Sequence, residues 1–438
     1  MKNTKTINGF SKLSKCDKIR WIAENYFKNP DEVCDFLEDF WHSDTDQQEI
    51  LDGFSENTIS NFPMPYGVAP NFLINDTTYI VPMVIEESSV VAAASAAAKF
   101  WMSRGGFRAQ IIGTKKIGQL HFKYNGTAQK LKNHFTDIKN HLINGTKDLT
   151  ANMEKRGGGV VDLELLDFSQ QEAYLFQIRG TFETCDSMGA NFINSILETW
   201  GGLLQSYIMQ NPVFTDEEKD TQIVMAILSN FTPDCLVRCE VRCPVDDLGV
   251  FAGGLDAHTF AEKFALAVRI AHLDEYRATT HNKGIYNGVD AVVLATGNDF
   301  RAIEACGHAY AAKDGKYRSL TYCEIKNNEF RFWIDLPLAV GTVGGLTKLH
   351  PLAKTSLDML GNPSAEDLMK IIAAVGLAQN FAALRSLVTT GIQQGHMKMH
   401  LQNILSNFNA SSDKKEAAQK HFEDKTVSYS AVRAFLEA

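Results

Sequence analysis

The sequence lacks the features that mark several common classes of protein. No apolar run approaches the roughly 20 residues needed to cross a membrane, and the most apolar stretch, 88–98, is short and rich in alanine. No apolar segment of a signal peptide follows the N-terminal Met1. The net charge of −9 argues against a general nucleic-acid binder. We therefore expect a cytoplasmic protein that binds neither membrane nor nucleic acid.

Several chemical motifs are also absent. The chain has no C-x-x-C pair, no H-E-x-x-H, no P-loop, and no G-x-G-x-x-G after a strand. Cys235, Cys239 and Cys243 recur every four residues. This spacing fits either a metal or redox cluster or a half-buried strand that uses cysteine as a small apolar residue. No histidine or fourth thiol accompanies them, which favours the strand and predicts no metal site.

The length indicates more than one domain, because 438 residues exceed what one hydrophobic core usually serves. Short amphipathic helices are expected over 13–54, a strand over 79–85, and an alanine-rich helix over 90–102 that Ser88 or Ser89 would cap. A long helix is expected from Asp256 to about His272.

Between these parts the pattern changes to alternating strands and helices. The expected elements are strands over 111–117, 120–124, 160–166, 173–182, 222–228 and 236–241, and helices over 126–155 and 186–209. The succession strand–helix–strand–strand–helix–strand is typical of a ferredoxin-like, split βαβ unit.

The predicted fold class is therefore α+β, with a large mixed helical domain interrupted by a smaller inserted one. The predicted division is a large domain over 1–108 and 244–390, the inserted domain over 109–243, and a polar C-terminal helical flap over 391–438.

Four short stretches place ionisable residues among small, apolar or glycine-rich neighbours, at 84–89, 280–285, 296–299 and 395–397. Such surroundings shift pKa values and are typical of sites that move protons. Glu86 and Glu87, at a strand end, could supply a general acid or could simply favour the positive end of the next helix. Each stretch by itself is a weak signal.

The other three stretches also have two interpretations each. Lys283, expected in a glycine-containing loop, could stabilise an oxyanion or could be a solvated surface lysine. Asp299, expected after a strand over 291–295, could be a site residue or the N-cap of the next helix. His396 could be a proton donor near neutral pH or an ordinary surface histidine.

A fifth segment, 186–191, opens a helix with Asp-Ser-Met-Gly-Ala-Asn. Its small residues and free backbone N–H groups suit a pyrophosphate, although an ordinary capped helix start has the same appearance.

Taken together and in this order, these stretches resemble one family, the soluble bacterial (class II) form of hydroxymethylglutaryl-CoA reductase. Matching segments also occur at 56–59 (Glu-Asn-Thr-Ile), 341–345 (Gly-Thr-Val-Gly-Gly) and 376–380 (Gly-Leu-Ala-Gln-Asn). The resemblance extends from Phe10 to about Asn403.

The resemblance implies four catalytic residues. Lys283 would stabilise the carbonyl oxygen, Glu87 would deliver protons, Asp299 would tune both, and His396 on the C-terminal flap would protonate the departing CoA thiolate. It implies substrate contacts by five further residues, namely Glu56, Ser89, Arg277, Asn287 and Asn380, of which Arg277 would bind the free carboxylate.

The cofactor implied by the resemblance is NADH or NADPH. The residues that would bind it are Asp148, Asp186, Ser187, Met188, Gly189 and Asn191. Asp148 would lie beside the ribose hydroxyls and repel a 2′-phosphate, so we lean toward NADH.

This chain departs from the family pattern at several positions. Ser88, Tyr286 and Ser187 replace the usual Pro, Met and Ala, and Ser11 stands where some members have an arginine for the CoA phosphates. The neighbouring Lys12 could serve the phosphates instead, and which residue does so is left open.

The implied function is the conversion of hydroxymethylglutaryl-CoA to mevalonate and CoA by two hydride transfers, in a homodimer or a larger assembly built from it. The same residues would also serve mevalonate degradation, and a non-redox CoA-thioester lyase or hydrolase is the other alternative.

Overall fold

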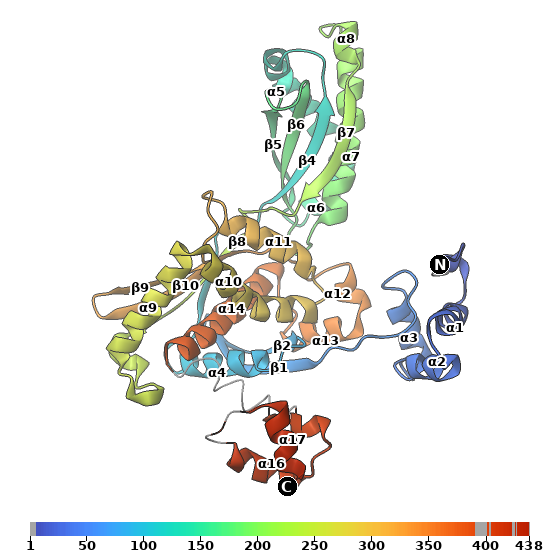
Figure 1. Cartoon of the computed structure of the whole chain (residues 1–438). Helices are drawn as coiled ribbons and strands as arrows, with labels where there is room; N and C mark the ends of the chain where they lie inside the picture. The colour runs from blue at the N-terminus through green and yellow to red at the C-terminus, as the bar shows by residue number, and fades with distance from the viewer. Residues whose placement is uncertain (1–5, 390–400, 403, 423–424, 426, 438) are drawn as a thin grey trace.

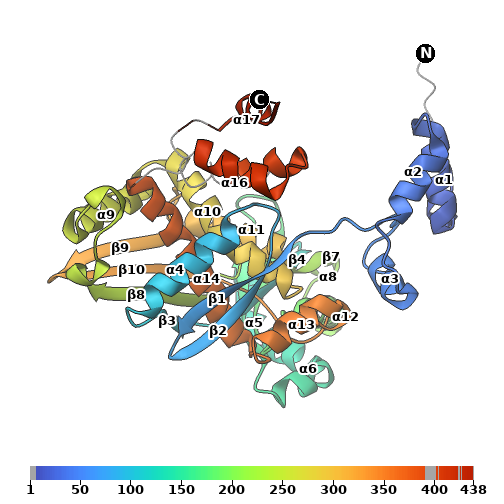
Figure 2. The same ribbon diagram turned by 90° about the horizontal axis from the view of Figure 1, so that it is seen from below.

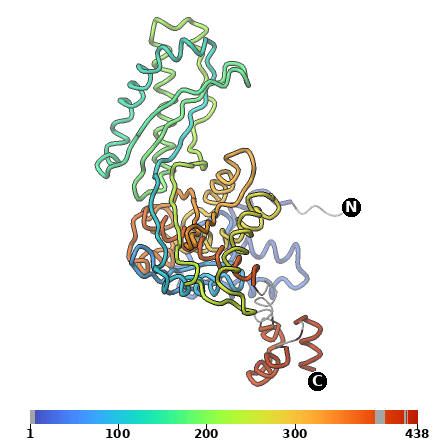
Figure 3. The backbone as a smooth tube through the Cα atoms, turned by 90° about the vertical axis from the view of Figure 1, so that its left-hand side faces the viewer, coloured from blue at the N-terminus to red at the C-terminus, as the bar shows by residue number. Residues whose placement is uncertain are grey.

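The computed structural model describes residues 6–389, 401–402, 404–422, 425 and 427–437. Figure 1 shows a central body, a smaller unit that stands on it, the N-terminal helices to one side and a C-terminal helical piece below. Figure 3 shows the small unit and the C-terminal piece at opposite ends of the body. The α+β class predicted from the sequence is confirmed.

The N-terminal helices form an arm that packs on itself and makes little contact with the body. They are α1 (Lys15–Tyr26), α2 (Pro30–Glu38) and α3 (Thr45–Asp52), preceded by the 3₁₀ turn η1 (Phe10–Lys12). Ser14 and Asp44 cap α1 and α3 through their side chains. The arm has its own small core around Ile19 and Ala23, and an extended segment joins it to the body (Figure 2).

The body contains two antiparallel sheets and the helices packed against them. A hairpin of β1 (Tyr66–Ile74) and β2 (Thr77–Val84) leads into α4 (Val90–Met102). A four-stranded antiparallel sheet has the order β3-β8-β10-β9, formed by Arg108–Ile111, Leu236–Pro244, Glu329–Pro337 and Thr321–Lys326. The remaining body elements are η2 (Val245–Leu248), η3 (Ala252–Gly254), α9 (Ala257–Leu273), α10 (Glu275–Ala295), α11 (Phe300–Ala311), α12 (Leu346–Leu349), α13 (Pro351–Met359) and α14 (Ala365–Val388).

Helix α14 is the centre of the body. It is long and apolar enough to cross a membrane, but 67% of its most apolar window is buried inside the protein. The burial of nearly every residue from Leu368 to Phe381 identifies it as a core helix. Cys239 and Cys243 lie in the same core on β8, so the apolar-strand interpretation of these cysteines is confirmed.

Helix α10 differs from the sequence prediction of a loop followed by a strand. Asp274 caps it, and its 21 residues continue through Gly284 and Gly288. A Cβ on Gly288 would lie 2.9 Å from the Cβ of Gln379 and 2.9 Å from the carbonyl oxygen of Val375. Gly288 therefore allows α10 and α14 to pack closely, and this burial outweighs the low helix propensity of glycine.

The small unit is a four-stranded antiparallel sheet with the order β5-β6-β4-β7. Its strands are β4 (Lys116–Lys123), β5 (Gly159–Asp167), β6 (Leu175–Glu183) and β7 (Gln222–Ser229), and its helices are α5 (Ala128–Gly145), α6 (Lys147–Glu154), α7 (Ala190–Gln210) and α8 (Asp216–Lys219). This order is that of a split βαβ unit. A separate core around Leu120, Phe182 and Trp200 holds the helices on the sheet.

The limits of the small sheet differ from the predicted insertion over 109–243. Strands β3 and β8, at the two ends of that segment, pair with each other in the body sheet. The single helix predicted over 126–155 is broken at Thr146, which is fully buried and donates to the carbonyl of Leu142. Tertiary pairing and burial, which a local pattern does not contain, decide both points.

The C-terminal piece contains α16 (Ser412–His421) and α17 (Tyr429–Glu437). Leu405, Ala418 and Val432 form part of its own small core.

Candidate functional site

One face of α10 supplies the floor of a cavity of about 490 Å³. Arg277, Thr280, Lys283 and Asn287 recur every three or four residues and therefore point the same way. Other elements complete the wall, with Glu87 and Ser89 from the segment between β2 and α4 and Gln379 and Asn380 from α14. Six predicted site residues therefore meet in one cavity: Glu87, Ser89, Arg277, Lys283, Asn287 and Asn380.

Lys283 and Glu87 form an ion pair at the cavity. The Lys283 Nζ donates to Glu87 Oε2 at 2.8 Å, and the Asn287 amide nitrogen donates to the same oxygen at 3.3 Å. The side chain of Lys283 remains 63% exposed and that of Glu87 38% exposed, so both are accessible to a ligand. A cation and a carboxyl group side by side can stabilise negative charge on an oxygen and exchange a proton with it.

A buried hydrogen-bond chain supports this arrangement from below. His281 Nε2 lies 2.6 Å from Thr321 Oγ1, which donates to Asn380 Oδ1 at 3.0 Å. Burial, and then the charges of Arg277 and His272, lower the pKa of His281 to about 3. His281 is therefore neutral near pH 7, and the chain joins α10, β9 and α14 without itself carrying charge.

Ser89 and Arg277 each have an unusual setting. Ser89 occupies the N-cap of α4 with a left-handed φ of 79°, and no cap hydrogen bond involves its side chain. The predicted capping role of Ser88 or Ser89 is therefore not seen.

Burial lowers the pKa of Arg277. Within the described part of the chain Arg277 forms no ion pair, which leaves its guanidinium available to an anionic ligand.

Asp299 takes the capping role that the sequence left open. It accepts hydrogen bonds from the backbone of Arg301 and Ala302 at the start of α11, and its carboxylate pairs with the Arg301 side chain at 3.1 Å. Burial acts to raise the pKa of Asp299, but the hydrogen bonds from Arg301 and Ala302 outweigh it and lower the pKa. The described contacts do not join Asp299 to Glu87 or Lys283.

Two further predicted residues, Glu56 and Asp148, are also absent from the lining of this cavity, and a third lies outside the described part of the chain. Glu56 is exposed in the turn after α3, at the base of the N-terminal arm. Asp148 is exposed in the first turn of α6. His396 lies outside the described residues.

The predicted turn before α7 lies at the junction of the small unit and the body. Asp186 accepts a hydrogen bond from the backbone of Ala365 at 2.8 Å, and the Ser187 hydroxyl accepts one from Gly189 at 3.1 Å. Gly189 is left-handed with a φ of 94°. A Cβ on Gly341 would lie 2.5 Å from the backbone nitrogen of Met188, so glycine is needed where the two segments meet.

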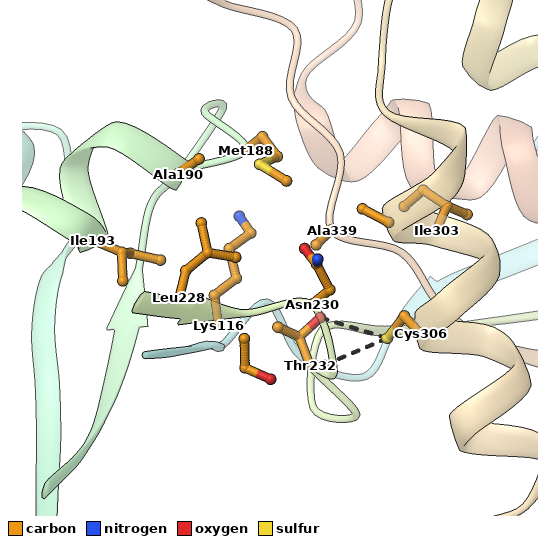
Figure 4. A pocket seen from close by; sticks show the side chains of 12 residues that line it. Lys116, Met188, Ala190, Ile193, Leu228, Asn230, Thr232, Ile303, Cys306 and Ala339 are labelled. Atoms are coloured by element: carbon orange, nitrogen blue, oxygen red, sulfur yellow. Dashed lines mark hydrogen bonds between the residues drawn. The ribbon is translucent and has the colours of Figure 1, made fainter. Parts of the chain in front are cut away.

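Met188 and Ala190 from this turn line a narrow pocket with residues of both units (Figure 4). On the body side, the backbone N–H of Thr232 donates a hydrogen bond to the sulfur of Cys306 at 3.4 Å. Asn191 follows in the first turn of α7 and is exposed.

Lys116 is a member of this pocket that the sequence analysis did not identify. It is only 4% exposed, and its Nζ donates to Thr184 Oγ1 at 2.5 Å and to the Ser187 carbonyl at 3.1 Å. In the described structure no carboxylate pairs with it. The strand pattern contained the signal, because Lys116 is in phase with buried Gly118, Leu120 and Phe122 on β4.

Comparisons with known proteins agree with the resemblance. The sequence profile of the family described as Hydroxymethylglutaryl-coenzyme A reductase matches residues 19–401. The 3-hydroxy-3-methylglutaryl-coenzyme A reductase of Archaeoglobus fulgidus is 37% identical over 93% of this chain and 88% of that protein. The probable reductase of Borreliella burgdorferi is 33% identical over 92% and 89%, respectively.

Solved structures give the same result. A 3-hydroxy-3-methylglutaryl-coenzyme A reductase from Streptococcus pneumoniae is similar with a TM-score of 0.73, at 36% identity and with 99% of each chain covered. A class II reductase from the same organism, bound to NADPH in open conformations, has a TM-score of 0.71 at 37% identity over 88% of this chain and 100% of that one.

Proposed function

This chain belongs to the hydroxymethylglutaryl-CoA reductase family, and from that premise we propose which of its residues carry each part of the reaction. The activity is an NAD(P)H-dependent reduction of hydroxymethylglutaryl-CoA to mevalonate and CoA in the mevalonate pathway. The ion pair of Lys283 and Glu87 in the cavity is the observation that supports the assignment most directly.

Lys283 binds the carbonyl oxygen of the thioester and stabilises the negative charge that develops there during reduction. Glu87, held by Lys283 and Asn287, protonates that oxygen. The same pair serves the second reduction, in which mevaldehyde becomes mevalonate. The bound nicotinamide supplies the hydride in both steps.

Arg277 pairs with the free carboxylate of the substrate, because a guanidinium binds a carboxylate through two parallel hydrogen bonds. Ser89 presents its hydroxyl to the substrate from the rim of the cavity. Asn287 and Asn380 position the reacting groups, the first through Glu87 and the second through the buried chain to Thr321.

Asp299 and His396 complete the proposed catalytic set. In this structure the Asp299 carboxylate pairs with Arg301 and forms no described contact with Lys283. A direct role for Asp299 therefore requires its carboxylate to leave Arg301 and pair with Lys283 once substrate is bound. His396 protonates the CoA thiolate as the intermediate collapses, a task that suits the pKa of an imidazole.

The nicotinamide cofactor fits the turn before α7. The N-terminus of the 21-residue α7 and the buried ammonium of Lys116 both offer positive charge there. A buried cation without a counter-charge is costly, and the diphosphate of a dinucleotide supplies two negative charges. Asp186, Ser187, Met188, Gly189 and Asn191 shape the turn that receives it.

Asp148 sets the preference for NADH over NADPH in this proposal. An Asp148→Lys change should shift the ratio of kcat/KM values toward NADPH by about tenfold, because it removes a charge that repels the 2′-phosphate. Steady-state kinetics with both cofactors test this, with Asp216→Lys, at a fully exposed side chain on α8, as the control for surface charge. An unchanged ratio would place the selectivity elsewhere.

The functional assembly is a homodimer with its sites at the subunit interface. The arm carries exposed aromatic side chains, and Phe62 in the connecting segment is 93% exposed. A second copy of the chain would cover these side chains. Its Glu56 would then enter the neighbouring site.

The direct test follows nicotinamide absorbance with hydroxymethylglutaryl-CoA and each cofactor, and then with mevalonate, CoA and each oxidised cofactor. We expect two molecules of reduced cofactor to be consumed for each thioester. Release of CoA without cofactor oxidation would instead indicate a lyase or hydrolase.

A further inference from the structure

A second cavity, of about 640 Å³, adjoins the Lys283 cavity. Ala93, Ala382 and Ser386 line both cavities. A long substrate whose reacting end lies at Lys283 can therefore continue into the second cavity without crossing the protein interior.

Two arginines dominate the charge of this second cavity. The guanidinium of Arg104 lies 3.8 Å from the centre of the Phe100 ring, and that of Arg385 lies 5.7 Å from the same ring. Both cations therefore meet at one aromatic side chain. No acidic residue is among the described residues that line the cavity.

The two arginines are held differently. Arg104 donates to the backbone carbonyls of Asp247 at 2.8 Å and Phe100 at 2.7 Å, so neutral groups fix its position. Burial, and then the charge of Arg104, lower the pKa of Arg385. Two like charges held together without a carboxylate are unfavourable until an anion joins them.

The distance between the reacting groups and these arginines suits the substrate. Helix α4 has 13 residues and separates Ser89 from Arg104, which corresponds to about 20 Å at 1.5 Å per residue. The pantetheine arm of CoA has the length of about four extended residues, roughly 15 Å. Ala93, Ala96 and Ala97 form the intervening wall and leave room for a chain to lie along the helix.

We propose that Arg104 and Arg385 bind the phosphate groups at the nucleotide end of CoA, with the pantetheine arm lying along the alanine face of α4. This inference rests on the proposed function. It assigns to these two residues the phosphate contact that Ser11 does not provide.

The test compares two thioesters, hydroxymethylglutaryl-CoA and hydroxymethylglutaryl-pantetheine, which lacks the nucleotide and its phosphates. Arg385→Met should raise the KM for the CoA thioester about ten- to a hundredfold, as expected for loss of a charge-assisted phosphate contact. Its kcat/KM for the pantetheine thioester should stay within about twofold of the unchanged protein. The exposed Arg269→Met, on α9, controls for the loss of one positive charge.

Arg104 also holds the end of α4, so its removal could unfold the protein. Arg104→Lys keeps the charge but loses the forked donor geometry, and calorimetry with free CoA measures its binding directly. We expect weaker CoA binding by Arg104→Lys and an unchanged thermal midpoint.

Equal losses on both thioesters, or an unchanged KM for the CoA thioester, would overturn the assignment. Reduction of the pantetheine thioester by the unchanged protein tests the proposed function separately, because that substrate does not need the arginines.

Discussion

Lys283 and Glu87 lie 196 positions apart in the chain and share one hydrogen bond. Each residue type is common on protein surfaces, and the local stretch around each one is a weak signal by itself. In the mechanism we propose, the chemistry arises from their proximity, because an ammonium fixed beside a carboxyl group is ready to stabilise charge as it develops on the substrate.

Lys283→Ala should lower kcat about 100- to 1000-fold, the usual loss when a preorganised donor to an oxyanion is removed. Steady-state kinetics measure the change, and circular dichroism checks that the fold is kept. The exposed Lys326→Ala, on β9, is the control. A kcat within about tenfold of the unchanged protein would remove Lys283 from the mechanism.

Asp290 lies on α10 near Glu304 of α11, and its Oδ1 atom has no hydrogen-bond partner. Burial, and then Glu304, raise the pKa of Asp290 to about 8. Between about pH 4 and 8 the folded protein therefore keeps a proton that the unfolded chain releases, so its stability falls as the pH rises through that window.

Asp290→Asn should remove this pH dependence, because the amide resembles the protonated acid and does not ionise. The urea midpoints of the two proteins should diverge from pH 5 to pH 8, with the variant becoming the more stable, at up to about 1.4 kcal/mol per pH unit. Midpoints that change in parallel would show that Asp290 is already ionised in the folded state.

Among the secondary-structure elements, α10 contributes most to the site, because it carries both Lys283 and Asn287 and packs closely against α14. Its position relative to Asn380 on α14 depends on how near the two helices approach.

Gly288→Ala should destabilise the protein by about 1 to 3 kcal/mol, since the added methyl group has no room against Gln379 and Val375. Activity should also fall, because α10 must move away from α14. Gly202→Ala is the matched control on α7, where a Cβ would meet nothing within 4 Å. It should stabilise by about 0.5 to 1 kcal/mol. Equal effects in urea unfolding would contradict this account of the helix contact.

Across the whole molecule, the N-terminal arm lies to one side of the body, away from helices α10 and α14 that line the cavity to which we assign Glu56 (Figure 2). If two copies of the chain exchange arms, each complete site contains Glu56 from one copy and Lys283 from the other.

Mixing inactive Glu56→Ala and Lys283→Ala proteins should then restore activity after their subunits exchange. Random pairing makes half of the dimers mixed, and each mixed dimer contains one intact site, so about a quarter of full activity should return. Each variant refolded alone is the control. If the mixture stays inactive while light scattering shows that exchange has occurred, Glu56 belongs to the site of its own chain or to none.

The sequence by itself determined the features that depend on neighbouring residues. The alanine-rich apolar run was enough to predict α4 over 90–102, and the long helix expected from Asp256 corresponds to α9. Alternating residues predicted most strands of the small sheet, and short motifs were sufficient to indicate the family. These features follow from periodicity and capping, which act within a few residues.

Only the tertiary structure decided the features that depend on distant contacts. Residues 275–295 form a helix that packs closely on α14 at Gly288, and β3 and β8 belong to the body because β8 pairs with both β3 and β10. Lys116 of β4 lies beside the turn before α7, where Thr184 and Ser187 accept hydrogen bonds from its buried ammonium. The contact energies that decide these outcomes come from residues far apart in the chain, so no local pattern contains them.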